Sequence, residues 1–96
     1  MSTQISIENK NVLVVGGAGF VGSNLCHYLL ATQSPSKLYI VDNLLSSDIS
    51  NVPVDSRVHF IYGSIADDRV LNQLPDDLQI VFHLACYHGN QSSIAD

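Results

Sequence analysis

Hydrophobic residues follow two different periods along this chain. Four short runs are almost entirely apolar, and the first of them ends in glycines, which is typical of a strand that is buried on both faces of a sheet. These predicted strands are Val12–Val15, Leu38–Val41, Val58–Tyr62 and Ile80–Ala85.

Between these runs the hydrophobic period becomes helical, and a helix is predicted from about Phe20 to Ala31. Its apolar positions are Val21, Leu25, Tyr28 and Leu29. A second helix is predicted from Ser64 to Leu74, with Asp67 and Asp68 in its first turn, where the helix dipole favours negative charge. The polar stretch from Ser46 to Ser56 is predicted to be a loop or a short helical turn.

Strands that alternate with helical segments predict parallel pairing and right-handed crossovers. We therefore expect the α/β class, as a doubly wound parallel sheet in three layers with the strand order 3-2-1-4. Four strands are few for such a sheet, and the chain stops without a turn or polar tail. We therefore interpret residues 1–96 as the N-terminal part of a larger domain.

The composition narrows the class of protein. Four basic residues stand against nine acidic ones, for a net charge of −5, and no basic stripe is present, so we expect no nucleic-acid partner. No apolar run approaches the ~20 residues that span a bilayer, and no secretory signal is visible, so we expect a cytoplasmic protein that does not enter a membrane. The four histidines lack metal-ligand spacing, and Cys26 and Cys86 are expected to be buried free thiols.

The segment after the first predicted strand carries the most specific chemistry. Gly16, Gly17, Gly19 and Gly22 form overlapping GxxGxxG and GxGxxG patterns between a strand and a helix. Glycines in this context allow a tight turn, let a pyrophosphate approach the backbone, and let the helix pack closely through Gly22. The helix N-terminus offers N–H groups and its positive dipole end to the phosphates. The pattern predicts a Rossmann-type dinucleotide site.

An acidic residue stands where such a site needs one. Asp42 ends the second predicted strand, twenty residues after Gly22, and its carboxylate can accept hydrogen bonds from the adenosine ribose hydroxyls. It would repel a 2′-phosphate, and no basic residue follows directly, which favours NAD over NADP. Methyltransferases that bind S-adenosylmethionine can show a similar turn and acid, and they stay open as an alternative.

Beyond these two features the chain resembles a known family. Gly16–Leu25 resembles the opening of extended short-chain dehydrogenase/reductases, and more narrowly that of NAD-dependent nucleotide-sugar epimerases and dehydratases. Tyr87–Ile94 further resembles a bacterial subgroup linked to lipopolysaccharide sugar synthesis. The resemblance extends from about residue 11 to residue 96. Other segments that match in register are Val41–Leu44, Gly63–Ile65 and Val81–Ala85.

The resemblance implies a role for each matching position. The glycine turn would hold the pyrophosphate, Asp42 and the loop after it the adenosine ribose, and Ser64 and Ile65 the adenine, while the end of the fourth strand would line the cleft toward the nicotinamide. The implied NAD-binding residues are Gly16, Gly19, Phe20, Val21, Asp42, Asn43, Ser46, Ser64, Ile65, Leu84, Ala85 and Tyr87. Ser64 replaces the family's usual Asp, and it is equally well interpreted as the N-cap of the second helix.

The family's proton transfer uses a Tyr-x-x-x-Lys motif, and none of the four tyrosines here has a lysine four positions later. We therefore name no catalytic residue, and we expect this segment to be inactive alone. The resemblance implies that the complete protein acts on a nucleotide sugar and that a homodimer would form through later regions. The alternatives are a non-catalytic dinucleotide-binding module and another Rossmann oxidoreductase.

The remaining polar residues near the strand ends allow less specific interpretations. His83 is expected inside the core, because it lies within an apolar run. His88, Asn90 and Gln91 follow the fourth strand at the end where ligands bind in open α/β sheets, so they either start a helix or contact a sugar.

Overall fold

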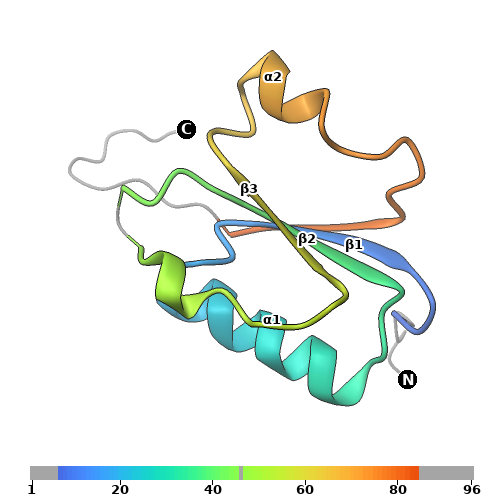
Figure 1. The fold of residues 1–96 in the computed structure, drawn as a ribbon. Helices are drawn as coiled ribbons and strands as arrows, with labels where there is room; N and C mark the ends of the chain where they lie inside the picture. The colour runs from blue at the N-terminus through green and yellow to red at the C-terminus, as the bar shows by residue number, and fades with distance from the viewer. Residues whose placement is uncertain (1–6, 46, 85–96) are drawn as a thin grey trace, which may run out of the picture.

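Four strands and one long helix make up most of the fold (Figure 1). The structure is a computed structural model, and it describes residues 7–45 and 47–84. The strands are β1 (Asn11–Val15), β2 (Lys37–Asp42), β3 (Val58–Tyr62) and β4 (Ile80–His83). The helices are α1 (Phe20–Thr32), the 3₁₀ helix η1 (Ile49–Asn51) and α2 (Asp68–Leu71). None of the helices in these two stretches is long and apolar enough to cross a membrane.

The strands form one parallel sheet in the order β3-β2-β1-β4, which confirms the predicted topology. β1 is central, and Val15 at its end is paired with Val41 of β2 and with His83 of β4. Because all four strands are parallel, their carboxyl ends lie at one edge of the sheet. Figure 1 shows that α1 begins at this same edge. The topology therefore brings the glycine turn and the ends of all four strands together.

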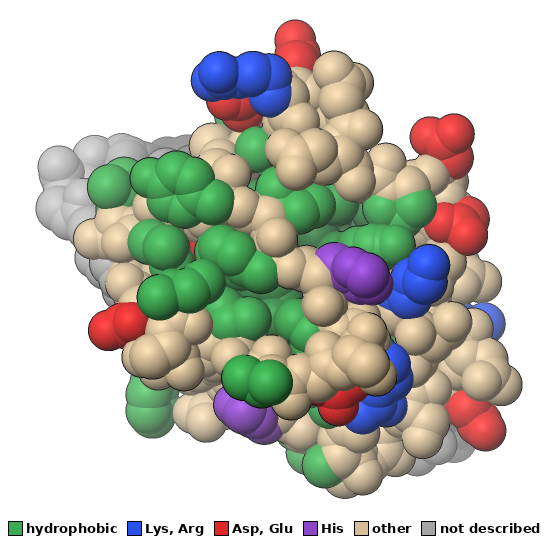
Figure 2. All heavy atoms as spheres, viewed as in Figure 1, with side chains coloured by type: hydrophobic (Ala, Val, Ile, Leu, Met, Phe, Trp, Pro, Cys, Tyr) green, Lys and Arg blue, Asp and Glu red, His purple; other side chains and the backbone are tan. Residues whose placement is uncertain are grey.

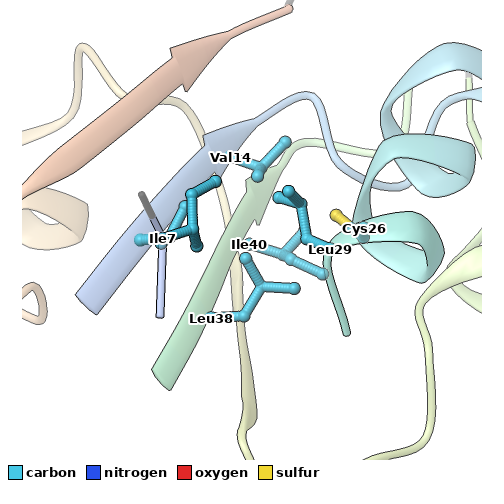
Figure 3. Packing of buried hydrophobic residues seen from close by; sticks show 7 residues of the cluster. Ile7, Val14, Cys26, Leu29, Leu38 and Ile40 are labelled. Atoms are coloured by element: carbon cyan, nitrogen blue, oxygen red, sulfur yellow. The ribbon is translucent and has the colours of Figure 1, made fainter. Parts of the chain in front are cut away.

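Each face of the sheet has its own hydrophobic cluster, because strand side chains alternate between the two faces. On one face Cys26 and Leu29 of α1 pack against the strands, as Figure 3 shows. The buried members of that cluster are Ile7, Val12, Val14, Cys26, Leu29, Leu38 and Ile40. The opposite cluster consists of Leu13, Val15, Tyr39, Val41, Ile61 and Val70 of α2. Each fully buried aliphatic side chain stabilises the fold by ~1.5–3 kcal/mol. The two clusters therefore stabilise the sheet from both faces, and they fix the positions at which its strands end.

The second helix is much shorter than the sequence pattern predicts. It spans Asp68–Leu71 rather than residues 64–74, and its N-cap is Asp67, whose side chain accepts a hydrogen bond from the backbone N–H of Arg69. The interpretation of Ser64 as the N-cap is therefore wrong. Ser64 instead accepts a hydrogen bond from the N–H of Ala66 in a preceding turn. Asp67 is the stronger cap because its charged carboxylate also pairs with the Arg69 guanidinium at 3.0 Å.

The expectation that His83 lies in the core is also wrong. Along β4, Ile80 and Phe82 pack against the α1 cluster, while Val81 and His83 are exposed. An apolar run shows that a strand is present, but it does not show that both of its faces are covered. Cys26 is buried as expected, whereas Cys86 lies outside the described residues.

Candidate functional site

A cavity of about 500 Å³ opens at the carboxyl edge of the sheet. This volume lies in the range that suits small-molecule and cofactor sites. Nine of the twelve predicted site residues line it: Gly16, Gly19, Phe20, Val21, Asp42, Asn43, Ser64, Ile65 and Leu84. The other three, Ser46, Ala85 and Tyr87, lie outside the described residues, as do His88, Asn90 and Gln91. The lining also includes Val15, Gly22, Val41, Ser47 and Gly63.

The surface around this edge is largely apolar. In Figure 2 hydrophobic side chains gather on the left and centre of the face, while charged side chains lie mainly toward its border. Phe20 and Val21, the first two residues of α1, are 81% and 66% exposed. Among the described residues that line the cavity, Asp42 is the only charged one. The cavity therefore suits a ligand with apolar ring faces and a small number of well-placed polar groups.

The turn from β1 into α1 depends on backbone conformations that favour glycine. Gly16 has a φ of +88°, in the left-handed region where a side chain is disfavoured. Its N–H donates to the carbonyl oxygen of Val41 at 2.7 Å, so the start of the turn is bonded to the end of β2. An added Cβ at Gly17 would lie 2.6 Å from Cγ2 of Ile40. Both positions hold the turn close against the sheet.

Gly22 allows α1 to start directly above this turn. An added Cβ there would lie 2.8 Å from the Cα of Gly17 and closer still to the carbonyl oxygen of Gly16. The sequence predicts that Gly22 brings the helix close to the strand, and the structure places its contact at the turn that follows β1. Gly22 therefore lets the N-terminus of α1 lie in contact with the turn, which sets its position relative to the cavity.

Gly19 has a different position, because it faces the cavity. It is the N-cap of α1, in extended conformation, and no side chain caps the helix there. An added Cβ would meet only the Gly16 carbonyl oxygen, at 3.5 Å. The first N–H groups of a helix have no partner within it, and the helix dipole adds partial positive charge at that end. A phosphate can approach this backbone, and the observed cradle fits a pyrophosphate.

Asp42 is nearly buried, with 8% of its surface exposed, and both carboxylate oxygens hold the surrounding loops. Oδ2 accepts a hydrogen bond from the N–H of Ala18 at 3.0 Å. Oδ1 accepts from the N–H of Leu44 at 2.8 Å and from the hydroxyl of Ser47 at 2.7 Å. A carboxylate offers about four lone-pair positions, so roughly one remains, on Oδ2. A ribose hydroxyl can donate to that position.

The loop after β2 contributes two residues that the sequence did not single out. Ser47 lines the cavity and donates to Asp42, whereas the sequence pointed to its neighbour Ser46. Asn51, in η1, donates from Nδ2 to the carbonyl oxygen of Ala18 at 2.9 Å. A cluster of short polar side chains between Asp42 and Pro53 was the only signal for either residue, and it does not say which of them turn inward.

The turn after β3 forms the remaining wall of the cavity. Gly63 has a φ of +143°, and Ser64 and Ile65 follow it along the lining. The Ser64 hydroxyl accepts from the N–H of Ala66, so its own proton can still be donated to a ligand. Across residues 7–45 and 47–84, no three histidine, cysteine or acidic side chains gather in a way that could hold a metal ion.

Comparison with known proteins identifies the family. The family model described as "NAD dependent epimerase/dehydratase family" matches residues 12–96. The chain belongs to this family. The match covers β1 from Val12 onward, the glycine turn and Asp42 together with the other residues that line the cavity.

Solved structures and curated sequences of this family agree with the assignment. The enzyme WbmF of Bordetella bronchiseptica in complex with NAD+ superposes with a TM-score of 0.81 at 55% sequence identity, over 92% of this chain and 26% of WbmF. A second WbmF structure, with NAD+ and UDP, gives a TM-score of 0.81 at 54% identity, over 94% of this chain and 27% of WbmF. A dTDP-D-glucose 4,6-dehydratase of Dictyostelium discoideum is 36% identical over 91% of this chain and 21% of its own length.

A UDP-glucose 4-epimerase of Neisseria meningitidis is 33% identical over 91% of this chain and 27% of its own length. The chain therefore spans about a quarter of the length of the family members that it matches. Dehydratases and epimerases both match it at similar identity, so the matched quarter is the part that these enzymes share.

Proposed function

We propose that this chain is the NAD-binding segment of an enzyme that acts on a nucleotide sugar, as an epimerase or a dehydratase. One observation carries the proposal: Asp42 lies in the same cavity as the glycine turn, with one carboxylate position left for a ribose hydroxyl. Residues 1–96 would form the N-terminal part of the enzyme's dinucleotide-binding domain. Similar proteins that bind NAD+ and UDP support the assignment.

Each wall of the cavity would hold one part of the dinucleotide. The N–H groups at the start of α1, around Gly19, would bind the pyrophosphate. Asp42 would bind the adenosine ribose, with Asn43 and Ser46 or Ser47 beside it. Ser64 and Ile65 would flank the adenine, and Leu84 with Ala85 and Tyr87 would line the path toward the nicotinamide.

When bound, NAD supplies a hydride acceptor that oxidises the sugar and later returns the hydride. The residues of this chain bind and orient the dinucleotide and exclude water from its adenosine half. Phe20 and Val21 contribute apolar surface at the mouth of the cavity, where they would cover the bound phosphates. Acid–base catalysis would come from residues that follow this segment.

Three narrower statements belong to the same proposal. The resemblance of residues 87–94 supports a sugar used in lipopolysaccharide synthesis. The enzyme would be cytoplasmic. A homodimer would form through regions outside these 96 residues.

Calorimetric titration of the complete protein with NAD and NADP tests the cofactor assignment. We expect NAD to bind at least ~10-fold more tightly than NADP, since the 2′-phosphate would meet the Asp42 carboxylate. The variant Asp42→Asn loses a charged acceptor, and it should weaken NAD binding by about 10-fold or more. Asp76→Asn is the matched control, because Asp76 is exposed and lies outside the cavity lining; the NAD affinity of this variant should change less than about twofold.

Three outcomes would count against the proposal. Equal or tighter binding of NADP would refute the role of Asp42. Tight binding of S-adenosylmethionine in place of NAD would favour the methyltransferase alternative. A complete protein that binds NAD but lacks a Tyr-x-x-x-Lys motif after residue 96 and converts no nucleotide sugar would be a non-catalytic dinucleotide-binding module.

A further inference from the structure

The peptide that joins Ala18 to Gly19 makes two hydrogen bonds of its own, and the peptide before it makes a third. Its carbonyl oxygen accepts a hydrogen bond from Nδ2 of Asn51 at 2.9 Å. Its N–H, which belongs to Gly19, donates to the carbonyl oxygen of Gly16 at 3.2 Å. The preceding N–H, that of Ala18, donates to Oδ2 of Asp42 at 3.0 Å. Of these contacts, the one from Asn51 is the only one made by a residue outside the cavity lining.

This peptide leads into Gly19, the N-cap of α1, so its orientation constrains where the first helical N–H groups point. Gly19 follows it directly and has no Cβ to limit rotation of the peptide plane. The Gly19 N–H bond to Gly16, at 3.2 Å, is at the upper end of the usual range, and it closes only a small local turn. A constraint on the carbonyl side of the same peptide is therefore needed to hold one orientation.

Asn51 is built to supply that constraint. It is the last residue of η1, and its own N–H donates to the carbonyl oxygen of Asp48 at 2.9 Å. The Asp48 side chain caps η1 by accepting from the N–H of Ser50, and this bond holds the pKa of Asp48 below its usual value. The amide of Asn51 thus extends from a closed and capped turn, although 33 residues separate it from Ala18 in the sequence.

We propose that Asn51 is a positioning residue of the dinucleotide site, which holds the Ala18–Gly19 peptide so that the N–H groups at the start of α1 face the pyrophosphate. The proposal rests on the proposed function, because it concerns the same cavity. It adds that the end of β2 and the loop after it act on two parts of the cofactor: Asp42 would bind the ribose directly, and Asn51 would act on the phosphates through the glycine turn.

The test compares ligands that differ in their phosphates. We would titrate the complete protein with NAD, ADP and adenosine, for the natural chain and for Asn51→Ala. Loss of one neutral hydrogen bond should weaken NAD and ADP by about fivefold. Adenosine lacks phosphates, so its affinity should be unchanged, because Asp42 at the end of β2 and Ser47 in the following loop keep their positions.

Two further variants separate positioning from general damage. Asn51→Gln retains the amide donor and should recover most of the NAD affinity. Asn24→Ala is the matched control: Asn24 is an exposed asparagine of α1 outside the cavity lining, and its replacement should leave all three affinities within about twofold.

The outcomes distinguish this inference from the proposed function. If the natural chain binds no NAD, both are overturned. If the natural chain binds NAD, and Asn51→Ala binds NAD and ADP as tightly as the natural chain does, only the positioning role is overturned. If Asn51→Ala loses adenosine together with ADP, Asn51 supports the whole loop structurally, and its specific role toward the phosphates is refuted.

Discussion

Gly19 and Gly22 lie three residues apart at the start of α1, yet they lack side chains for different reasons. At Gly22 a methyl group would collide with the backbone of Gly16 and Gly17, which cannot move without displacing the turn. At Gly19 a methyl group would fill space that faces the cavity. The absence of a side chain at Gly22 is therefore a requirement of folding, and its absence at Gly19 is a requirement of ligand binding.

The variant Gly22→Ala should lower the free energy of unfolding by about 1–3 kcal/mol, the usual cost of overpacking. Alanine is a better helix former by ~1 kcal/mol, but this gain does not offset a collision with backbone atoms. Urea denaturation of the complete protein measures the loss. A Gly22→Ala protein as stable as the natural one would show that α1 can move away from the turn.

Gly19→Ala is the matched variant, and it should give the opposite result. Its added Cβ makes only an ordinary contact at 3.5 Å, so stability should fall by less than about 1 kcal/mol, mainly through the poorer N-cap. The same methyl group would obstruct the phosphate, so NAD affinity should fall by 10-fold or more in calorimetry. Unchanged affinity would contradict the placement of the pyrophosphate at Gly19.

Cys26 should make the free energy of unfolding decrease at alkaline pH. Burial in the α1 cluster raises the pKa of its thiol to about 12, because the thiolate would lose its hydration. The unfolded thiol ionises near pH ~8.5–9, so stability should fall as the pH rises from about 9 toward 12. By pH 10 the loss attributable to Cys26 should be about 1–2 kcal/mol. Urea denaturation at pH 8 and pH 10 should show it in the natural protein, and the loss should shrink by that amount in Cys26→Ala.

At the scale of elements, the sequence predicted the strands and α1 well but predicted α2 poorly. The strands and α1 carry long apolar patterns whose periods differ, and their bounds agree with the prediction to within about two residues. Between Ser64 and Leu74 two possible caps compete, and the pattern does not decide between Ser64 and Asp67. The choice depends on the pairing of Asp67 with Arg69, which is a contact of side chains in three dimensions.

The contacts of the candidate site also divide into those that the sequence predicts and those that it does not. Contacts made by the backbone at fixed glycine spacing were predictable, because only glycine satisfies the steric demands of that turn. The contributions of Ser47 and Asn51 were not, because they depend on how the loop folds back after Leu44, which has a left-handed φ of +61°. Several polar residues share that loop, and no sequence pattern distinguishes those that point inward.

The C-terminal end of α1 offers a test of element boundaries. Gln33 is the C-cap, and Ser34 follows it with a φ of +49°, a left-handed conformation that favours glycine. The Ser34 side chain is exposed, so Ser34→Gly removes strain without loss of packing. We expect a gain of about 0.5–1 kcal/mol in unfolding free energy, after the greater flexibility of glycine in the unfolded chain is subtracted.

Ser36→Gly is the matched control for Ser34→Gly. Ser36 is also exposed, but it has no positive φ, so glycine there should cost about 0.5–1 kcal/mol. The two variants should therefore shift the midpoint of urea denaturation in opposite directions. A shift in the same direction for both would mean that α1 does not end at Gln33.

At the scale of the whole molecule, the sheet has a rigid centre and a ligand-facing edge. β1 and β2 each have a neighbouring strand on both sides, whereas β3 has one neighbour within the described residues, and α2 is a single turn. The cavity lies where the rigid strands end and the loops begin. Hydrogen exchange should therefore be slowest at the amides of β1 and β2 and much faster in α2.

Bound NAD should change this pattern unevenly. At a free NAD concentration of ~100 times the dissociation constant, the native state gains about 2.7 kcal/mol, which slows exchange by roughly 100-fold wherever an amide exchanges only through global unfolding. The amides of β1 and β2 should show this full effect, and those of residues 19–22 should also slow, because the ligand covers them. The amides of Asp68–Leu71 should change little, since α2 opens locally without exposing the cavity. Equal slowing in α2 and β1 would show that the second helix unfolds together with the site, and the division of the molecule into a rigid centre and independent outer turns would be refuted.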